Sequence, residues 1–140
     1  METLKKDHLV RYLGISNVGV EQLRELIHGA KIKPRFVQNR CFASEGWDKE
    51  VRSICDEFQI TYQGFSLLTA NFREIGVASI QEMAEKYQKT IPQIIFKFSR
   101  QIGMIPLTGT TNPEHMRLDL EIDDFQLTRE ELHHIETIAT

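Results

Sequence analysis

The chain has 140 residues, a length that suits one domain with a hydrophobic core of its own. Hydrophobic residues make up 41% and charged residues 26%, which is typical of a globular protein and excludes an intrinsically disordered chain. The net charge of −3 argues against a general nucleic-acid binder, and no apolar run approaches the roughly 20 residues that span a bilayer.

The apolar pattern alternates between short runs and helical periodicity. After a helical lead at residues 2–8, a short run at residues 12–15 precedes an i, i+3, i+6, i+7 stripe at residues 20–27. A second short run, at residues 36–37, precedes a second stripe at residues 47–58. Each short run predicts a buried strand, and each stripe predicts a helix with one buried face.

The alternation continues in the second half of the chain. A run at residues 60–65 predicts a third strand, and a stripe at residues 80–87 predicts the helix after it. A further helix follows, which Thr90 caps and Gly103 ends. The run at residues 104–107 predicts a fourth strand.

Two helices complete the chain. Asn112 and Pro113 open the first, and Thr128 forms a capping box with Glu131 at the start of the second. The resulting order, β-α-β-α-β-α-α-β-α-α, predicts right-handed crossovers and an α/β fold with a parallel sheet.

The ends of the strands are the informative places, because ligands of parallel α/β folds bind beyond the carboxyl ends of the strands. The first strand ends in Ser16 and Asn17, the second in Gln38, the third in Phe65 and the fourth in residues 108–111. Any one of these polar ends suits a turn or a helix cap. All four together favour a binding rim made of amides and hydroxyls.

The segment GTTNP after the fourth strand has two interpretations. A helix N-terminus offers unpaired N–H groups and a partial positive charge, so the segment could hold a phosphate. Gly109 would let a ligand approach the backbone, and Thr110 and Thr111 would add hydroxyl donors. The alternative is ordinary turn chemistry, since Asn followed by Pro commonly begins a helix.

No catalytic constellation is visible. His115 could face a phosphate or lie on the surface, and surface positions are expected for His8 and His28. His133 and His134 are adjacent on a helix and point in different directions, which makes them a poor metal pair. These residues alone predict a small-molecule binding domain with no metal site.

The cysteines indicate a reduced environment. Cys41 and Cys55 are too few for a disulfide framework or a zinc site, and Cys41 and Tyr62 lack a recognisable base partner. The N-terminal METLKKDHLV lacks the apolar core of a signal peptide. A cytoplasmic protein without a membrane segment is the simplest prediction.

Five segments of the sequence resemble segments of one protein family, in the same order and at the same spacing: RYLGISNVGVEQLREL, KIKPRFVQNRCF, GFSLL, AEKYQKTIPQIIFKFSRQIGMIPLTGTTNPEHM and DDFQLTREELHHIETI. They resemble strands five to eight, the extra helix, the phosphate loop and the ending of the aldo-keto reductases. The likeness is to the C-terminal half of these NADP-dependent oxidoreductases and covers essentially the whole chain. It implies half of a (β/α)8 TIM barrel over residues 1–140, with about four parallel strands, surrounding helices and a C-terminal extra helix.

The resemblance also implies a nicotinamide cofactor, NADP or alternatively NAD. Ser16, Asn17 and Gln38 would hydrogen-bond the nicotinamide carboxamide, and Phe65 would stack on the nicotinamide ring. The remaining contacts would be Ser66 and Leu68 along the pyrophosphate, Gly109, Thr110, Thr111 and Asn112 at the 2′-phosphate and ribose, and His115 and Asp119 at the adenosine end.

The chain departs from the family pattern at the adenosine end. The family often has a lysine near Gly109 and an arginine at His115, both of which select the extra phosphate of NADP. Arg117 and a protonated His115 are the candidate substitutes. Asp119 stands where an asparagine often contacts adenine, so the choice between NADP and NAD stays open.

The family's catalytic aspartate, tyrosine, lysine and histidine come from the other half of the barrel. Tyr12 and Tyr62 do not match those positions. We therefore expect a cofactor-binding half that is inactive alone. The alternatives are an enzyme completed by a separate N-terminal half, or a non-catalytic interaction domain or truncated product. Because half a barrel leaves two open edges, it would have to flatten, self-associate or pair with such a half.

Overall fold

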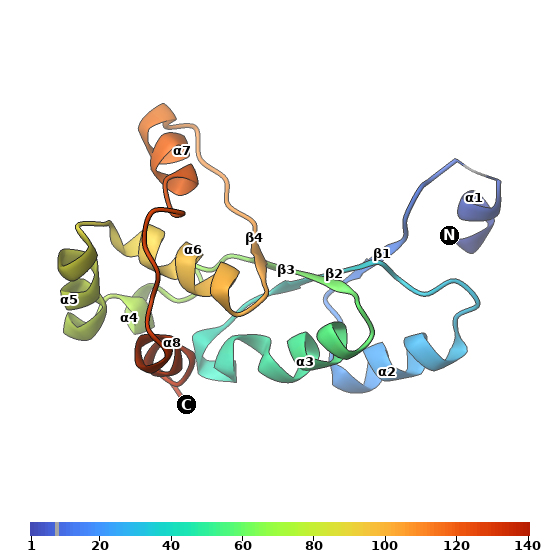
Figure 1. Ribbon diagram of the computed structural model, residues 1–140. Coiled ribbons are helices and arrows are strands. Elements are labelled where there is room, and N and C mark those ends of the chain that lie inside the picture. Colours follow the sequence, from blue (N-terminus) through green and yellow to red (C-terminus); the bar gives the residue numbers. More distant parts are fainter. Residues whose placement is uncertain (8) are drawn as a thin grey trace.

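The computed structural model describes residues 1–7 and 9–140, so the expected surface position of His8 lies outside the described residues. Four parallel strands form one sheet in the order β1-β2-β3-β4 (Figure 1). They are β1 (Gly14–Ser16), β2 (Phe36–Arg40), β3 (Thr61–Phe65) and β4 (Ile105–Pro106). The predicted α/β class with four parallel strands is confirmed.

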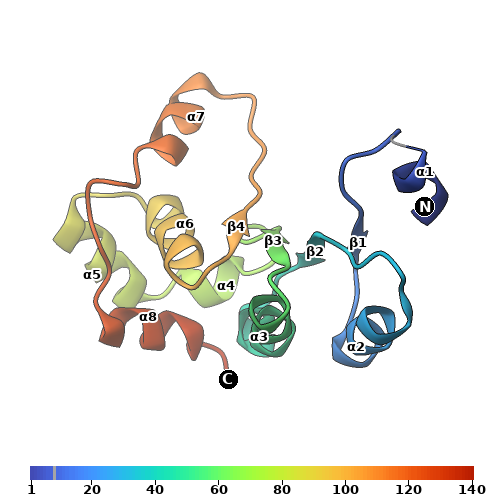
Figure 2. The ribbon, with the colours of Figure 1, turned by 45° about the vertical axis from the view of Figure 1, so that its right-hand side comes forward.

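Helices connect and surround the strands. Their bounds are α1 (Glu2–Lys6), α2 (Val20–Gly29), the 3-10 helix η1 (Ala43–Asp48), α3 (Lys49–Glu57), α4 (Phe72–Ile75), α5 (Ala78–Tyr87), α6 (Ile91–Gln101), α7 (Pro113–Leu120) and α8 (Arg129–Glu136). In both views α2 and α3 lie along one face of the sheet (Figures 1 and 2). Among the described residues, no helix lies over the middle of the opposite face.

The register of the strands places three polar side chains and one apolar side chain in one row across the sheet. Ser16 pairs with Gln38, Gln38 with Gln63, and Gln63 with Ile105. Because side chains alternate along a strand, these four lie on the same face. The residues between them, such as Tyr62, belong to the hydrophobic core beneath the helices.

The core is centred on Trp47. This side chain is fully buried and meets Phe98 of α6 edge-on, with 5.3 Å between the ring centroids. Its indole Nε1 donates a hydrogen bond to the Ile135 carbonyl of α8 at 2.8 Å. The last helix is thereby fixed to the segment that follows β2, far away in sequence.

The predicted elements agree with the structure apart from their ends and two short helices. The first strand begins at Gly14 rather than at residue 12, and Tyr12 is exposed. Thr90, Asn112 and Thr128 each accept a hydrogen bond from the first turn of their helix, as predicted. The pattern did not predict η1 or the four-residue α4. No helix of the described chain is long and apolar enough to cross a membrane.

Candidate functional site

The first part of the predicted rim lies at the carboxyl end of β1 and at the middle of β2, which continues two residues beyond Gln38. Gln38 Nε2 donates a hydrogen bond to Gln63 Oε1 of β3 at 3.2 Å, which orients the Gln38 carboxamide. The Gln38 carbonyl accepts a hydrogen bond from the Asn17 N–H at 3.1 Å. Ser16 is exposed on the same face of the sheet. The contact between Gln38 and Gln63 was not predicted from the sequence.

The residue that directly follows β1 and the residue that directly follows β3 both have a left-handed backbone conformation. Asn17, directly after β1, has φ 54°, and Ser66, directly after β3, has φ 59°. Such angles are uncommon outside glycine and are strained, although asparagine tolerates them. They turn the chain sharply at the strand end, so that the residues that follow lie beside the rim.

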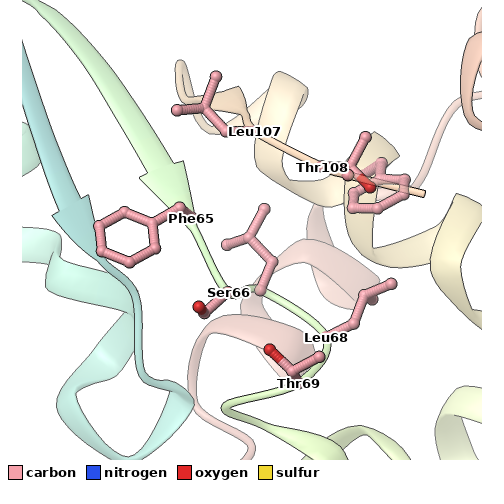
Figure 3. A pocket seen from close by; sticks show the side chains of 9 residues that line it. Phe65, Ser66, Leu68, Thr69, Leu107 and Thr108 are labelled. Carbon is pink, nitrogen blue, oxygen red and sulfur yellow. The ribbon is translucent and has the colours of Figure 1, made fainter. Parts of the chain in front are cut away.

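A pocket of about 370 Å³ lies between the ends of β3 and β4. Phe65, Ser66, Leu68 and Thr69 line it from the end of β3 and the loop that follows, and Leu107 and Thr108 approach from the other side (Figure 3). Phe96 of α6 and Gly109 also line it. The pocket therefore combines an apolar floor with hydroxyl groups at its margin.

A second pocket of about 360 Å³ adjoins the first and continues toward α7. The two share Leu68, Thr108 and Gly109. The second is completed by Thr90, Pro92, Thr110, His115, Leu118 and Asp119. Together the two pockets form one continuous surface from Phe65 to Asp119.

Helix α7 is held in place by a buried glutamine of α6. Gln93 is 2% exposed, and its Nε2 donates hydrogen bonds to the Leu118 carbonyl at 3.0 Å and the Glu121 carbonyl at 3.1 Å.

The loop before α7 forms hydrogen bonds within itself that cap the start of the helix. Thr110 Oγ1 accepts a hydrogen bond from the Asn112 N–H, and Asn112 Oδ1 accepts one from the Glu114 N–H. The turn chemistry expected of GTTNP is thus present, and it leaves the side of Gly109 open.

Charges near the second pocket are mostly acidic. Asp119 lines the pocket and accepts a hydrogen bond from Thr108 Oγ1 at 3.3 Å. Arg117 pairs instead with Glu114 and Glu121, each at 2.5 Å. The Arg117 contact lowers the pKa of Glu114, and the two carboxylates raise the pKa of Arg117.

Tyr62 and Cys41 lie on the helix-covered face of the sheet. Burial, followed by the contacts with Cys41 and Asp48, raises the pKa of Tyr62, whose hydroxyl donates to Asp48 Oδ2 at 2.7 Å. Burial likewise raises the pKa of Cys41 to about 12. Both groups stay protonated at neutral pH, which supports a structural role. Among the described residues, no three His, Cys, Asp or Glu side chains form a group that could hold a metal ion.

The structure brings together most of the predicted site residues. Those that line the two pockets are Phe65, Ser66, Leu68, Gly109, Thr110, His115 and Asp119. Ser16, Asn17 and Gln38 form the neighbouring rim of β1 and β2. Thr111 and Asn112 are exposed and line neither pocket. The sequence did not point to four further lining residues, which come from α6 and its N-cap and from α7: Thr90, Pro92, Phe96 and Leu118.

Known proteins resemble this chain over its full extent. The aldo/keto reductase family model matches residues 1–140. Aldose reductase B of Dictyostelium discoideum is 29% identical over 99% of this chain and 44% of its own length. D-galacturonate reductase of Fragaria ananassa is 34% identical over 94% of this chain and 43% of its own. The chain thus spans about half the length of the curated relatives it matches.

Solved structures share the fold. An aldo-keto reductase from a Medee basin deep-sea metagenome library has a TM-score of 0.88 at 24% identity, covering 98% of this chain and 51% of its own. The Bombyx mori aldo-keto reductase in complex with NADP has a TM-score of 0.86 at 24% identity, covering 99% of this chain and 48% of its own. This likeness confirms the predicted fold class, a partial TIM barrel.

Proposed function

Because the chain belongs to the aldo/keto reductase family, we propose that it is the nicotinamide-cofactor-binding, C-terminal half of a carbonyl/alcohol oxidoreductase. Residues 1–140 would form this half as one domain. The segments that resemble strands five to eight support the assignment, as does the coverage of 43–49% of the relatives' length. The NADP complex of the Bombyx mori relative supports a nicotinamide dinucleotide as the ligand.

One observation carries the proposal, namely the continuous surface from Phe65 to Asp119, which lies next to the rim of β1 and β2. The Gln38 Nε2 donates to Gln63, so the Gln38 Oε1 would be the acceptor for the carboxamide NH₂ of nicotinamide. Ser16 and Asn17 supply complementary groups, and Phe65 offers a ring face for stacking.

The surface beyond Phe65 suits the rest of a dinucleotide. Ser66 and Leu68 line the first pocket, where the pyrophosphate would lie. A Cβ atom at Gly109 would meet no atom within 4 Å, so the backbone at Gly109 is open to the ribose region of a ligand. His115 and Asp119 would face the adenosine end.

The bound cofactor would supply hydride chemistry, and this chain's residues would hold and orient it. The carboxamide contacts and Phe65 would fix which face of the nicotinamide ring is presented. Tyr62 is buried on the other face of the sheet, with a raised pKa, and cannot donate a proton at the rim. We propose that the chain alone does not reduce carbonyl compounds, because the proton donor lies in the other half of the family's barrel.

The open edges of the sheet support a partner for this half. Leu9 and Tyr12 near β1, and Ile105 in β4, are large apolar residues that are 71%, 55% and 46% exposed. Unpaired strand edges with apolar neighbours favour association. We propose an N-terminal half-barrel, or a second copy of the chain, as the partner, in the cytoplasm.

Titration with NADH and NADPH, followed by fluorescence anisotropy of the reduced nicotinamide, tests the proposal. We expect saturable binding of a reduced cofactor and no reductase activity without a partner. Gln38→Leu should weaken binding by about tenfold, since it removes a hydrogen bond to the carboxamide. Thr61→Val, on the same face of the sheet but at the opposite end of β3, is the matched control. Absence of binding by the folded wild-type chain would refute the proposal.

A further inference from the structure

The pocket at the proposed adenosine end holds a fixed negative charge and no fixed positive charge. Among the described residues that line it, Asp119 is the only carboxylate, His115 is the only other titratable group, and there is no lysine or arginine. A 2′-phosphate, with a charge near −2, would have to enter this pocket without a permanent cation to neutralise it.

Asp119 contributes a carboxylate to the lining of this pocket. One carboxylate oxygen, Oδ2, accepts from Thr108 Oγ1 at 3.3 Å, and within the described chain the other has no hydrogen-bond donor. In dinucleotide sites of the Rossmann type, a carboxylate at the adenosine ribose accepts a hydrogen bond from a free 2′-hydroxyl, whereas an arginine accommodates a 2′-phosphate, and the same chemistry would apply to a carboxylate in this pocket. The side chain is half-buried, so its charge is only partly screened by solvent.

Arg117, one turn after the loop, is engaged elsewhere. Its Nε and Nη2 hold Glu114 at 3.0 and 2.5 Å, and its Nη1 holds Glu121 at 2.5 Å. A phosphate would have to replace these carboxylates. Residues 113–121 therefore contain three carboxylates, Glu114, Asp119 and Glu121, and a single guanidinium.

Lys89 is the other nearby candidate, since it directly precedes the pocket residue Thr90. Its Nζ donates to Asp124 Oδ2 at 2.7 Å and to the Glu121 carbonyl at 3.3 Å. Both partners lie at or beyond the C-terminal end of α7, away from the loop at Gly109. Neither cation of this region therefore lines the pocket.

We propose that Asp119 makes this site select NAD(H), with its free 2′-hydroxyl, over NADP(H). The inference rests on the proposed function and reverses the usual preference implied by the resemblance. Like-charge repulsion between Asp119 and the 2′-phosphate sets the discrimination, and we expect NADH to bind about tenfold more tightly than NADPH at low salt.

Competition between NADH and NADPH for the wild-type chain and its variants tests this selection. Asp119→Asn keeps the shape and removes the charge, so the ratio of the two affinities should fall toward one while NADH binding persists. His115→Arg should shift the ratio toward NADPH. Asp123→Asn, an exposed carboxylate paired with Arg100 outside the pocket, should leave the ratio unchanged.

The possible failures are distinguishable. If neither dinucleotide binds, the proposed function falls and this inference falls with it. If NADPH binds as tightly as NADH or more tightly, the proposed function stands and the NAD(H) preference is overturned. If Asp119→Asn still binds NADH but keeps the wild-type ratio, Asp119 is not the selecting residue.

Discussion

Buried amides fix the loops that carry the rim. Asn71 is 1% exposed and bonds to two separate loops. Its Oδ1 accepts from the Ala43 N–H at 2.6 Å, and its Nδ2 donates to the Cys41 and Leu67 carbonyls, each at 2.9 Å. The loops after β2 and β3 are thereby joined directly behind the first pocket.

Asn71→Ala should therefore destabilise the chain by about 3 kcal/mol, because buried backbone groups would lose their partners. Urea unfolding followed by the fluorescence of Trp47 measures this change. Gln81→Ala, which removes an exposed contact with Glu85, is the control and should have little effect. A loss below about 0.5 kcal/mol for Asn71→Ala would mean that water satisfies these groups.

Helix α8 is joined to α5 by one carboxylate. Glu131 Oε1 accepts from Lys86 Nζ at 2.8 Å, and its Oε2 accepts from the Tyr87 hydroxyl at 2.7 Å and the Thr128 N–H at 2.8 Å. Burial opposes ionisation of Glu131, but these hydrogen bonds outweigh it and lower its pKa from 4.5 to about 2. The ionised form is thus stabilised in the folded chain.

This lowered pKa predicts a specific acid sensitivity. The stabilisation is complete above the unfolded pKa of 4.5 and is lost as the pH falls toward about 2. The thermal midpoint of Glu131→Gln should therefore lie below that of the wild type at pH 7 and approach it at pH 3. Glu130→Gln, an exposed neighbour, is the control. A difference between Glu131→Gln and wild type that is the same at both pH values would contradict the account.

The helices and strands were predictable where local chemistry decides them. The βα alternation gave four strands, and the caps at Thr90 and Thr128 marked helix starts correctly. The segment before α3 was not predictable, because Trp47 and Asp48 adopt left-handed backbone. That conformation accompanies long-range contacts of Asp48 with Asn39 and Tyr62, which no local pattern reveals.

The candidate site was likewise predictable only where local sequence decides the position of a residue. Phe65 ends β3 as predicted, whereas Gln38, predicted at the end of the second strand, lies in the middle of β2, which continues to Arg40. The pairing of Gln38 with Gln63 depends on strand register, and the ion pairs of Arg117 depend on side-chain rotamers. The exclusion of Arg117 from the pocket could therefore only be found from the structure.

The chain as a whole is a sheet with helices on one face and its other face open in both views (Figures 1 and 2). Closed barrels have no strand edges, whereas β1 and β4 each have one here. The open face carries Gln38, Gln63 and Phe65, so a partner that closes the barrel would also cover the proposed cofactor site. Binding of the cofactor and of the partner should then stabilise the same surface.

Mapping of NADH onto the chain by backbone amide chemical shifts tests the proposed cofactor site most directly. The proposal predicts saturable shifts at the amides of Ser16, Gln38, Phe65 and Gly109. Residues at the opposite edge of the sheet, such as Gln59, should not respond. Shifts confined to that opposite edge, or no shifts from a folded sample at saturating NADH and NADPH, would contradict the assignment of this surface as a nicotinamide-cofactor site.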